Sequence, residues 1–247
     1  MFTYNSGIAQ YSRLNAFIWG LMAFQAGAIN VGGFLACHKF VSHVTGFATH
    51  FAASLAHGEL YTAFGLISVP LFFLFGSFIS GMAVDTRIQK AQKPLYPLIF
   101  GLMSILLLAV TVAGVRGDFG AFGSPINLVF DYSLLAALSL SSGLQNATVT
   151  SAFNSVVRTT HLTGLTTDLG IGFARLLRRA HSKNSRENEI LATGMRLFII
   201  VSFISGSSLS GFIFFHAEYW GFLIPSSIAI ILWVWSLKNF SKNGKAS

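Results

Sequence analysis

Residues 95–115, LYPLIFGLMSILLLAVTVAGV, contain no charged side chain over 21 positions. A helix rises about 1.5 Å per residue and the hydrocarbon core of a bilayer is about 30 Å thick, so about 20 apolar residues cross it. Lys93 and Arg116 flank the run and end it on both sides. This stretch predicts a membrane-spanning helix.

The whole chain shares this apolar character. Its 247 residues are 53% hydrophobic and 10% charged, whereas soluble domains average about 45–50% and about 25%. The single cysteine, Cys37, excludes a disulfide within the chain. The net charge of +8 comes from cations that lie mostly between the apolar runs, where positive charge orients membrane proteins. We therefore expect an integral membrane protein embedded in the lipid bilayer, and neither a soluble enzyme nor a nucleic-acid-binding protein.

Six segments are long enough to span a bilayer and two are shorter. The six predicted spans are Leu14–Ala36, Leu60–Val84, Leu95–Val115, Phe130–Ala152, Arg196–His216 and Tyr219–Leu237. The shorter segments, Val44–His57 and Leu162–Leu177, contain polar residues and reach only about 20–25 Å as helices. We expect these two to be re-entrant half-helices.

The distribution of Lys and Arg favours this arrangement over eight crossings, since short cytoplasmic loops are rich in both residues. With eight crossings and a cytoplasmic N-terminus, 11 of the 16 cations lie inside. If the two short segments instead return to the side they entered, Arg87, Lys90, Lys93 and Arg158 move inside and Arg116 moves outside, which places 14 inside. Both termini are then predicted to be cytoplasmic.

Three sequence elements occur twice, in the same order. His43-Val-Thr45-Gly46-Phe-Ala-Thr49-His50 returns as His161-Leu-Thr163-Gly164-Leu-Thr-Thr167-Asp168, Gly27-x-x-Asn30 as Gly143-x-x-Asn146, and Gly76-x-x-x-Ser80-Gly81 as Gly206-x-x-x-Ser210-Gly211. We expect one membrane domain, residues 1–247, with internal repeats at about 14–115 and 130–237. Each half would cross the membrane three times. Because three is an odd number, the second half is inverted relative to the first, as in many transporters. The alternative is eight spans in two parallel halves.

The elements His43-Val-Thr45-Gly46 and Thr160-His161-Leu-Thr163-Gly164-Leu-Thr-Thr167-Asp168-Leu169 also carry a family resemblance. At these residues, and over nearly its whole length, the chain resembles the YoaK-like family of bacterial membrane proteins, a domain of unknown function. Phe47 departs from the pattern, because many members have a small polar residue there. The resemblance implies a multi-pass protein of the bacterial inner, or cytoplasmic, membrane, without an established substrate.

The polar residues of the repeated elements form the candidate substrate-binding site. Non-helical backbone at membrane depth lines a cavity or is buried in protein, because unpaired peptide groups in hydrocarbon cost several kcal/mol. Each threonine is predicted to cap a half-helix whose N-terminus attracts anions, and each glycine leaves room for close approach. The predicted substrate-binding residues are His43, Thr45, Gly46, His161, Thr163, Gly164, Asn30 and Asn146. Internal hydrogen bonding of buried polar groups is the alternative explanation.

Asp168 is the only acidic residue well inside a predicted membrane segment, and His50 is its counterpart in the first repeat. An intramembrane carboxylate indicates an ion pathway or a proton relay, so the two residues are candidates for proton coupling. A salt bridge from Asp168 to Arg158 or Arg175 is the structural alternative. The histidines near His50 are seven residues apart, which does not suit a zinc site, so no metal is predicted.

Sequence motifs for nucleotide binding, acyl transfer and metalloprotease chemistry are absent. We expect no enzyme activity and no cofactor; an intramembrane enzyme using a histidine with Asp168 would lack a nucleophile or metal set. The sequence favours a secondary transporter or channel-like permease for a small polar or anionic solute. The alternative is a non-transporting scaffold or complex-assembly protein. Rows of Gly and Ser on the predicted spans allow close packing between helices, and a homo-oligomer therefore stays among the expected partners.

Overall fold

The computed structural model describes residues 13–124, 128–152, 162–177 and 183–242. All regular structure in these residues is helical. In chain order the elements are α1 (Arg13–Cys37), α2 (Val44–Ala56), α3 (Leu60–Ser80), the π-helical segment η1 (Gly81–Asp85), α4 (Thr86–Gln89), α5 (Tyr96–Val115), α6 (Leu128–Ala152), α7 (Leu162–Leu177), α8 (Lys183–Ala217), the 3-10 segment η2 (Glu218–Phe222) and α9 (Leu223–Lys242).

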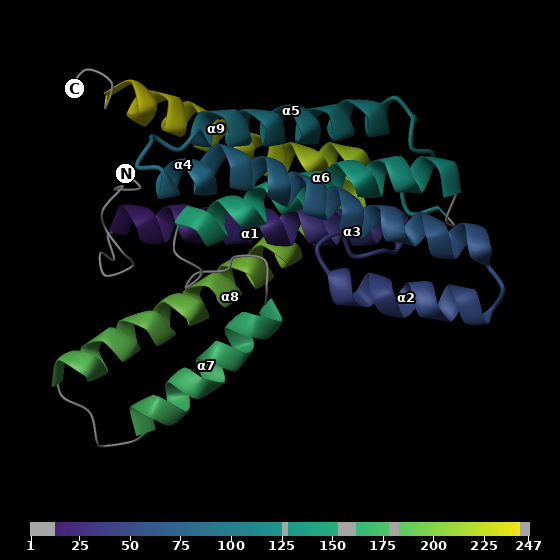
Figure 1. Cartoon of the computed structure of the whole chain (residues 1–247). Coiled ribbons are helices and arrows are strands. Elements are labelled where there is room, and N and C mark those ends of the chain that lie inside the picture. The colour runs from purple at the N-terminus through teal and green to yellow at the C-terminus, as the bar shows by residue number, and fades with distance from the viewer. Residues whose placement is uncertain (1–12, 125–127, 153–161, 178–182, 243–247) are drawn as a thin grey trace.

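Four helical runs are long and apolar enough to cross a membrane. They are Leu14–Cys37, Leu60–Gln89, Tyr96–Val115 and Arg186–Phe240, the last of which includes α8, η2 and α9. The long helices lie side by side, and the first turns of α1 and the last turns of α9 are at the same end of the bundle (Figure 1). The fold is therefore that of an all-helical membrane protein.

Helix α6 is not among these four runs, because it carries many polar side chains. Ser139, Ser141, Gln145 and Thr148 are all buried, each at most 1% exposed. Helix α6 contacts α1, α3 and α5, so that other helices pack around it. A helix that is enclosed by protein can carry inward-facing polar groups that a lipid-facing helix cannot.

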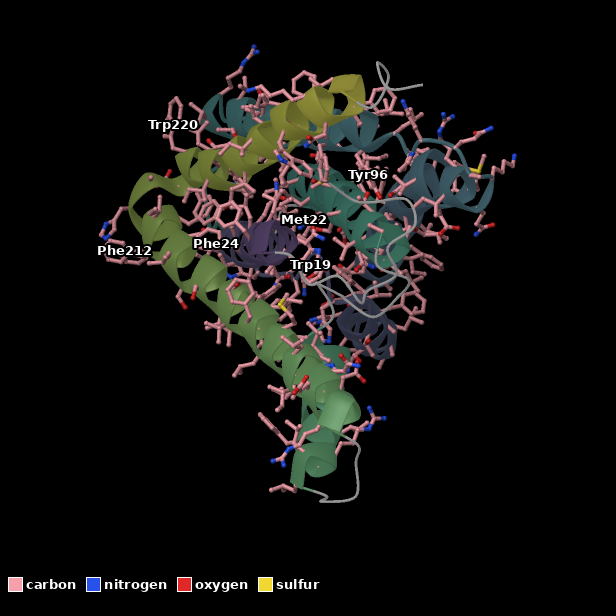
Figure 2. The ribbon with its side chains drawn as sticks, turned by 90° about the vertical axis from the view of Figure 1, so that its left-hand side faces the viewer. Trp19, Met22, Phe24, Tyr96, Phe212 and Trp220 are labelled. Atoms are coloured by element: carbon pink, nitrogen blue, oxygen red, sulfur yellow. The ribbon has the colours of Figure 1, made fainter. Side chains whose placement is uncertain are left out.

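The outer surface of the bundle is apolar. Phe212 and Trp220 point outward, whereas Trp19 and Met22 point into the interior (Figure 2). Helices α3 and α8 expose rows of large apolar residues, namely Leu71, Phe72, Leu74, Phe75, Phe78, Leu197, Phe198, Val201, Ile204 and Leu209. Such a continuous apolar exterior suits lipid and not water.

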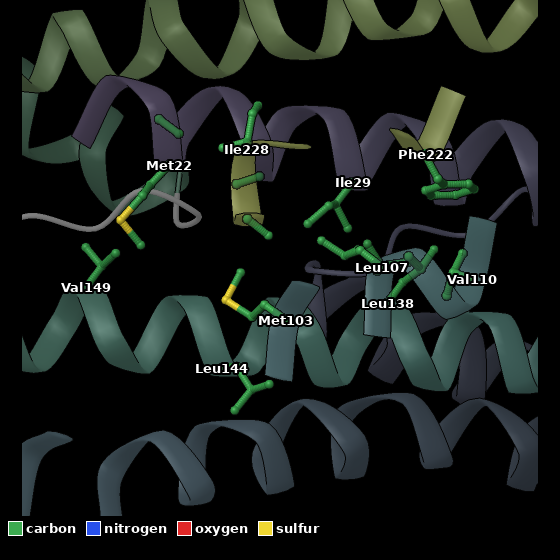
Figure 3. Close-up of a cluster of buried hydrophobic side chains, with 14 of the residues drawn as sticks. Met22, Ile29, Met103, Leu107, Val110, Leu138, Leu144, Val149, Phe222 and Ile228 are labelled. Atoms are coloured by element: carbon green, nitrogen blue, oxygen red, sulfur yellow. The ribbon is translucent and has the colours of Figure 1, made fainter. Parts of the chain in front are cut away.

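The centre of the bundle is a hydrophobic cluster contributed by α1, α5, α6, η2 and α9 (Figure 3). Its members include Ile29 of α1, Leu138 of α6, and Met103 and Leu107 of α5. All four are completely buried. Through this cluster the two central helices pack against the α5–α9 pair, since α1 contacts α9 and α6 contacts α5.

Helix α1 packs on α8 in the same way as α6 packs on α3. The Ser207 hydroxyl donates to the carbonyl oxygen of Gly27 over 3.1 Å, and the Ser77 hydroxyl donates to that of Gly143 over 3.3 Å. These residues are counterparts in the two halves of the sequence. The same contact therefore occurs once between α1 and α8 and once between α3 and α6.

The short helices attach to these pairs, since α7 packs on α8 and α2 packs on α3 (Figure 1). The described residues thus contain two groups of three helices with corresponding members. We call α1, α7 and α8 the A-unit, and α6, α2 and α3 the B-unit. Each unit combines helices from both halves of the chain.

Candidate solute-binding cavity

A cavity of about 390 Å³ lies where the N-terminal ends of α2 and α7 come together. The two helices begin near the middle of the molecule and run from there towards opposite ends (Figure 1). The cavity is lined by Asn30, Phe40, Ser42, His43, Val44, Thr45, Leu162, Thr163 and Phe203. It therefore collects residues of both repeated His-x-Thr-Gly elements in one place.

The start of α2 differs from the prediction that Thr45 caps it. The helix begins at Val44, so that His43 is the N-cap residue, and no side chain makes a capping hydrogen bond. The amides of Gly46 and Phe47 donate to the His43 carbonyl oxygen over 3.0 and 3.3 Å. Thr45 is instead the second helical residue, and it lines the cavity. The capping prediction was wrong because the cap is His43, two residues before Thr45.

Helix α7 repeats this arrangement. Its described residues begin at Leu162, so Thr163 lies inside the helix, and the predicted cap is wrong here too. Thr167 donates to the Thr163 carbonyl oxygen over 3.0 Å, as Thr49 does to that of Thr45 over 3.4 Å. His161, the counterpart of His43, lies outside the described residues.

The polar groups on the cavity wall include hydrogen-bond donors beside hydroxyl oxygens that can also accept. The Ser42 hydroxyl donates to Oδ1 of Asn30 over 3.1 Å, so the amide nitrogen of Asn30 keeps two N–H groups for another partner. The first backbone N–H groups of α2, at Val44 and Thr45, have no acceptor within the helix. None of the nine lining residues is acidic. Such a wall suits an anion or a carbonyl oxygen better than a cation.

An aromatic stack forms one side of the cavity. Phe34 stacks on Phe40 with ring centroids 4.7 Å apart, and Phe40 meets the His43 ring edge-on at 6.0 Å. A Cβ atom added at Gly46 would lie 2.6 Å from Nδ1 of His43. The room that Gly46 leaves is therefore filled by the His43 ring, and not open to a solute. Because glycine has no side chain, the imidazole of His43 can lie directly against the helix at this position.

Four other predicted residues lie away from the cavity wall. Gly164 is half-buried on α7, and Asn146 is 9% exposed on α6, and neither lines the cavity. His50 and Asp168 are exposed on α2 and α7, and the described residues show no hydrogen bond or ion pair between them. Because α2 and α7 diverge from the cavity (Figure 1), these two residues are not a contacting pair.

Arg175, one proposed partner of Asp168, pairs with a different acid. Its Nη1 lies 3.3 Å from Oε2 of Glu189, whose other oxygen lies 3.2 Å from Nη1 of Arg196. Glu189 and Arg196 belong to α8, so this cluster ties α7 to α8. Arg158, the other proposed partner, lies outside the described residues. In the described part of the chain no group of three His, Cys, Asp or Glu side chains is arranged to hold a metal ion.

Sequence reasoning did not identify Phe40, Ser42 and Phe203 as lining residues. Ser42 directly precedes His43, so the repeated element could have been extended by one residue to include it. The two phenylalanines gave no signal, because the chain contains 25 phenylalanines, many of which face lipid.

Residues 18–235 match a protein-family model described as "Protein of unknown function (DUF1275)". No curated protein and no solved structure matches the chain. The match covers most of the 247 residues, and it confirms the YoaK-like resemblance. The chain therefore belongs to the DUF1275 family of proteins of unknown function.

Proposed function

We propose that this protein is a secondary transporter for a small polar solute, with an anion as the preferred substrate. The proposal rests on the cavity at which the N-termini of α2 and α7 meet. Each helix N-terminus contributes about half a positive charge from its aligned peptide dipoles. With hydrogen-bond donors on the wall and no carboxylate among the lining residues, this charge favours an anion.

The proposed membrane topology has six crossing helices and two re-entrant half-helices in an inverted repeat. The equivalent contacts at Gly27 and Gly143 support the repeat. Helix α2 contains only 13 residues and the described part of α7 contains 16, which gives about 20 and 24 Å, shorter than an ordinary span. They also point towards opposite ends of the bundle (Figure 1). These features favour the inverted repeat over eight spans in parallel halves.

The cellular location follows from this topology. With α1 beginning and α9 ending at one end of the bundle, and 14 of the 16 cations of the sequence on the inner side in this topology, we place both termini in the cytoplasm. The membrane is the inner membrane of a bacterium, as the family resemblance implies. In this topology Lys39 is on the opposite side of the membrane from the termini. It directly precedes the lining residue Phe40.

Proton coupling through Asp168 and His50 remains part of the proposal. Each residue follows the lining threonine of its helix by five positions, at Thr163 and Thr45. A change in the charge of either residue would alter the field along that short helix. The coupling is therefore proposed to act on the two helices separately, and not through a direct Asp–His bond.

Flux into proteoliposomes tests the transport proposal. Nitrate, sulfate, inorganic phosphate and acetate are compared with neutral urea and glycerol, in vesicles with and without the protein. We expect protein-dependent uptake of at least one anion, which a pH gradient accelerates in the wild type and not in Asp168→Asn. Asp118→Asn, at an exposed loop carboxylate, serves as the matched control. No uptake of any solute would refute transport, and an unchanged pH response in Asp168→Asn would refute the coupling.

Thiol labelling tests the cavity independently of the solute. Cysteine is placed at Thr45 or Thr163 in a Cys37→Ser background, and at the lipid-facing Phe78 as a control. A small charged thiol reagent should modify the two cavity positions and spare Phe78. If neither cavity position reacts, the polar residues pack dry, and the scaffold or assembly role becomes the better account.

A further inference from the structure

Within each unit, two long helices cross with their backbones in direct contact. A Cβ atom added at Gly27 of α1 would lie 2.2 Å from the Phe203 carbonyl oxygen of α8, and one added at Gly206 would lie 2.1 Å from the Phe24 carbonyl oxygen. No side chain separates the two helices at this crossing. Backbone contact of this kind leaves little freedom to slide, since close-packed interiors resist deformation.

The B-unit repeats this crossing with the counterpart residues. The added Cβ would lie 2.1 Å from the Phe73 carbonyl oxygen at Gly143, and 2.2 Å from the Leu140 carbonyl oxygen at Gly76. One turn further along α3, the hydroxyls of Ser80 and Thr148 are 2.7 Å apart. Each unit is thus built as a rigid pair of long helices with one short helix attached.

The contact between the units, where α1 meets α6, has a different character. Gln145 donates to the Met22 carbonyl oxygen over 2.6 Å, yet its own Oε1 has no partner in the described residues. The same holds for Oγ of Ser141, which lies one turn before Gln145 on α6 and is fully buried. A buried acceptor without a partner is energetically unfavourable. This contact is therefore not fully satisfied in the observed arrangement.

The cavity lies across the boundary between the two units. Asn30, Leu162, Thr163 and Phe203 come from the A-unit, and Val44 and Thr45 come from the B-unit. A movement of one unit relative to the other therefore changes the shape of the cavity. A movement within a unit is resisted by the backbone crossings.

We propose that the A-unit and the B-unit rock against each other as rigid bodies, with α1 and α6 as the sliding contact, and that this motion exposes the cavity alternately to the two sides of the membrane. The inference rests on the proposed transport function and deepens it, because it makes the protein a carrier and not an open channel. The α5–α9 pair, which contacts α6 through α5 and α1 through α9, forms the frame against which both units move.

Distances between pairs of spin labels test the inference in proteoliposomes. Labels on His57→Cys at the end of α2 and Leu177→Cys at the end of α7 report the distance between the units. Pairs within one unit are His57→Cys with Phe78→Cys, and Leu177→Cys with Phe212→Cys. These side chains are exposed, Leu177 by 84%, and none lines the cavity. All variants carry Cys37→Ser. Distances are measured without solute and with each of nitrate, sulfate, phosphate and acetate.

We expect the distance between the units to shift, or a second distance to appear, when the transported anion is added, while both distances within the units stay fixed. A single unchanged distance between the units, in vesicles that take up an anion, would refute rocking and leave the transport proposal standing. Equal shifts within the units would also refute it, because the units would not be rigid. If no anion is taken up, transport fails, and two distances between the units without solute would still support the motion.

Discussion

Replacing Gly143 with alanine should force α6 away from α3. The new Cβ would lie 2.1 Å from the carbonyl oxygen of Phe73 and 3.1 Å from its Cα. Both atoms belong to the backbone of α3 and cannot rotate away. To lengthen the contact to 3.0 Å, below which real Cβ atoms are essentially never found, the helices must separate by about 0.9 Å. The hydrogen bond from Ser77 to Gly143, already 3.3 Å long, would then be lost.

Two opposing terms set the size of the effect. Overpacking a tight contact costs about 1–3 kcal/mol, and the rigid backbone places this case at the upper end. Alanine favours a helix over glycine by about 1 kcal/mol, so the net loss is about 2 kcal/mol. For a domain of this size, 1 kcal/mol corresponds to about 2–4 °C in the unfolding midpoint. We therefore expect Gly143→Ala to lower the midpoint by about 4–8 °C.

The measurement is the thermal unfolding midpoint of the purified protein in one detergent at one heating rate. Gly194→Ala is the matched control, because a Cβ at this helical position would meet nothing within 4 Å, and it should raise the midpoint by about 2–4 °C. Gly27→Ala, at the counterpart crossing, should behave like Gly143→Ala. A Gly143→Ala midpoint at or above that of Gly194→Ala would refute the packing argument.

Two further changes test local features. Ala91 has a backbone φ of 56°, which costs a non-glycine residue about 1 kcal/mol, so Ala91→Gly should raise the unfolding midpoint by about 2–4 °C, whereas Ala113→Gly inside α5 should lower it. Glu189→Gln removes the acid shared by Arg175 and Arg196 and should speed hydrogen exchange in the last turns of α7. Arg175→Gln should have a smaller effect, because this side chain is 54% exposed; equal effects would contradict the role of Glu189 as the link.

The secondary structure was largely predictable because it depends on local patterns. The short segment at Leu162–Leu177 coincides with α7, and the predicted start at Val44 coincides with that of α2. Helix α8 begins at Lys183 and not at Arg196, because hydropathy detects only the part of a helix that suits lipid. The first part of α8, residues 183–195, is polar and contains Glu189. The ion pair of Glu189 with Arg175 of α7 could not be predicted from the sequence.

The site was predictable in its location and not in its details. The repeated elements identified His43, Thr45, Asn30 and Thr163, which line one cavity. The cap residue was assigned wrongly because threonine favours that position in general. Here the helix begins at Val44, and a glycine three residues after His43 leaves space for the His43 ring. The general preference of threonine for the cap position does not take this side-chain contact into account.

The two repeated asparagines offer the sharpest link between the repeat and the proposed motion. Asn30 lines the cavity, whereas its counterpart Asn146 is 9% exposed and does not line it. If the units exchange roles when they rock, Asn146 faces the solute in the other arrangement. Both Asn30→Ala and Asn146→Ala should then reduce anion uptake at equal amounts of folded protein. Asn188→Ala, at an exposed position on α8, should not. Uptake by Asn146→Ala equal to that of Asn188→Ala would mean that only one of the two equivalent positions serves the solute.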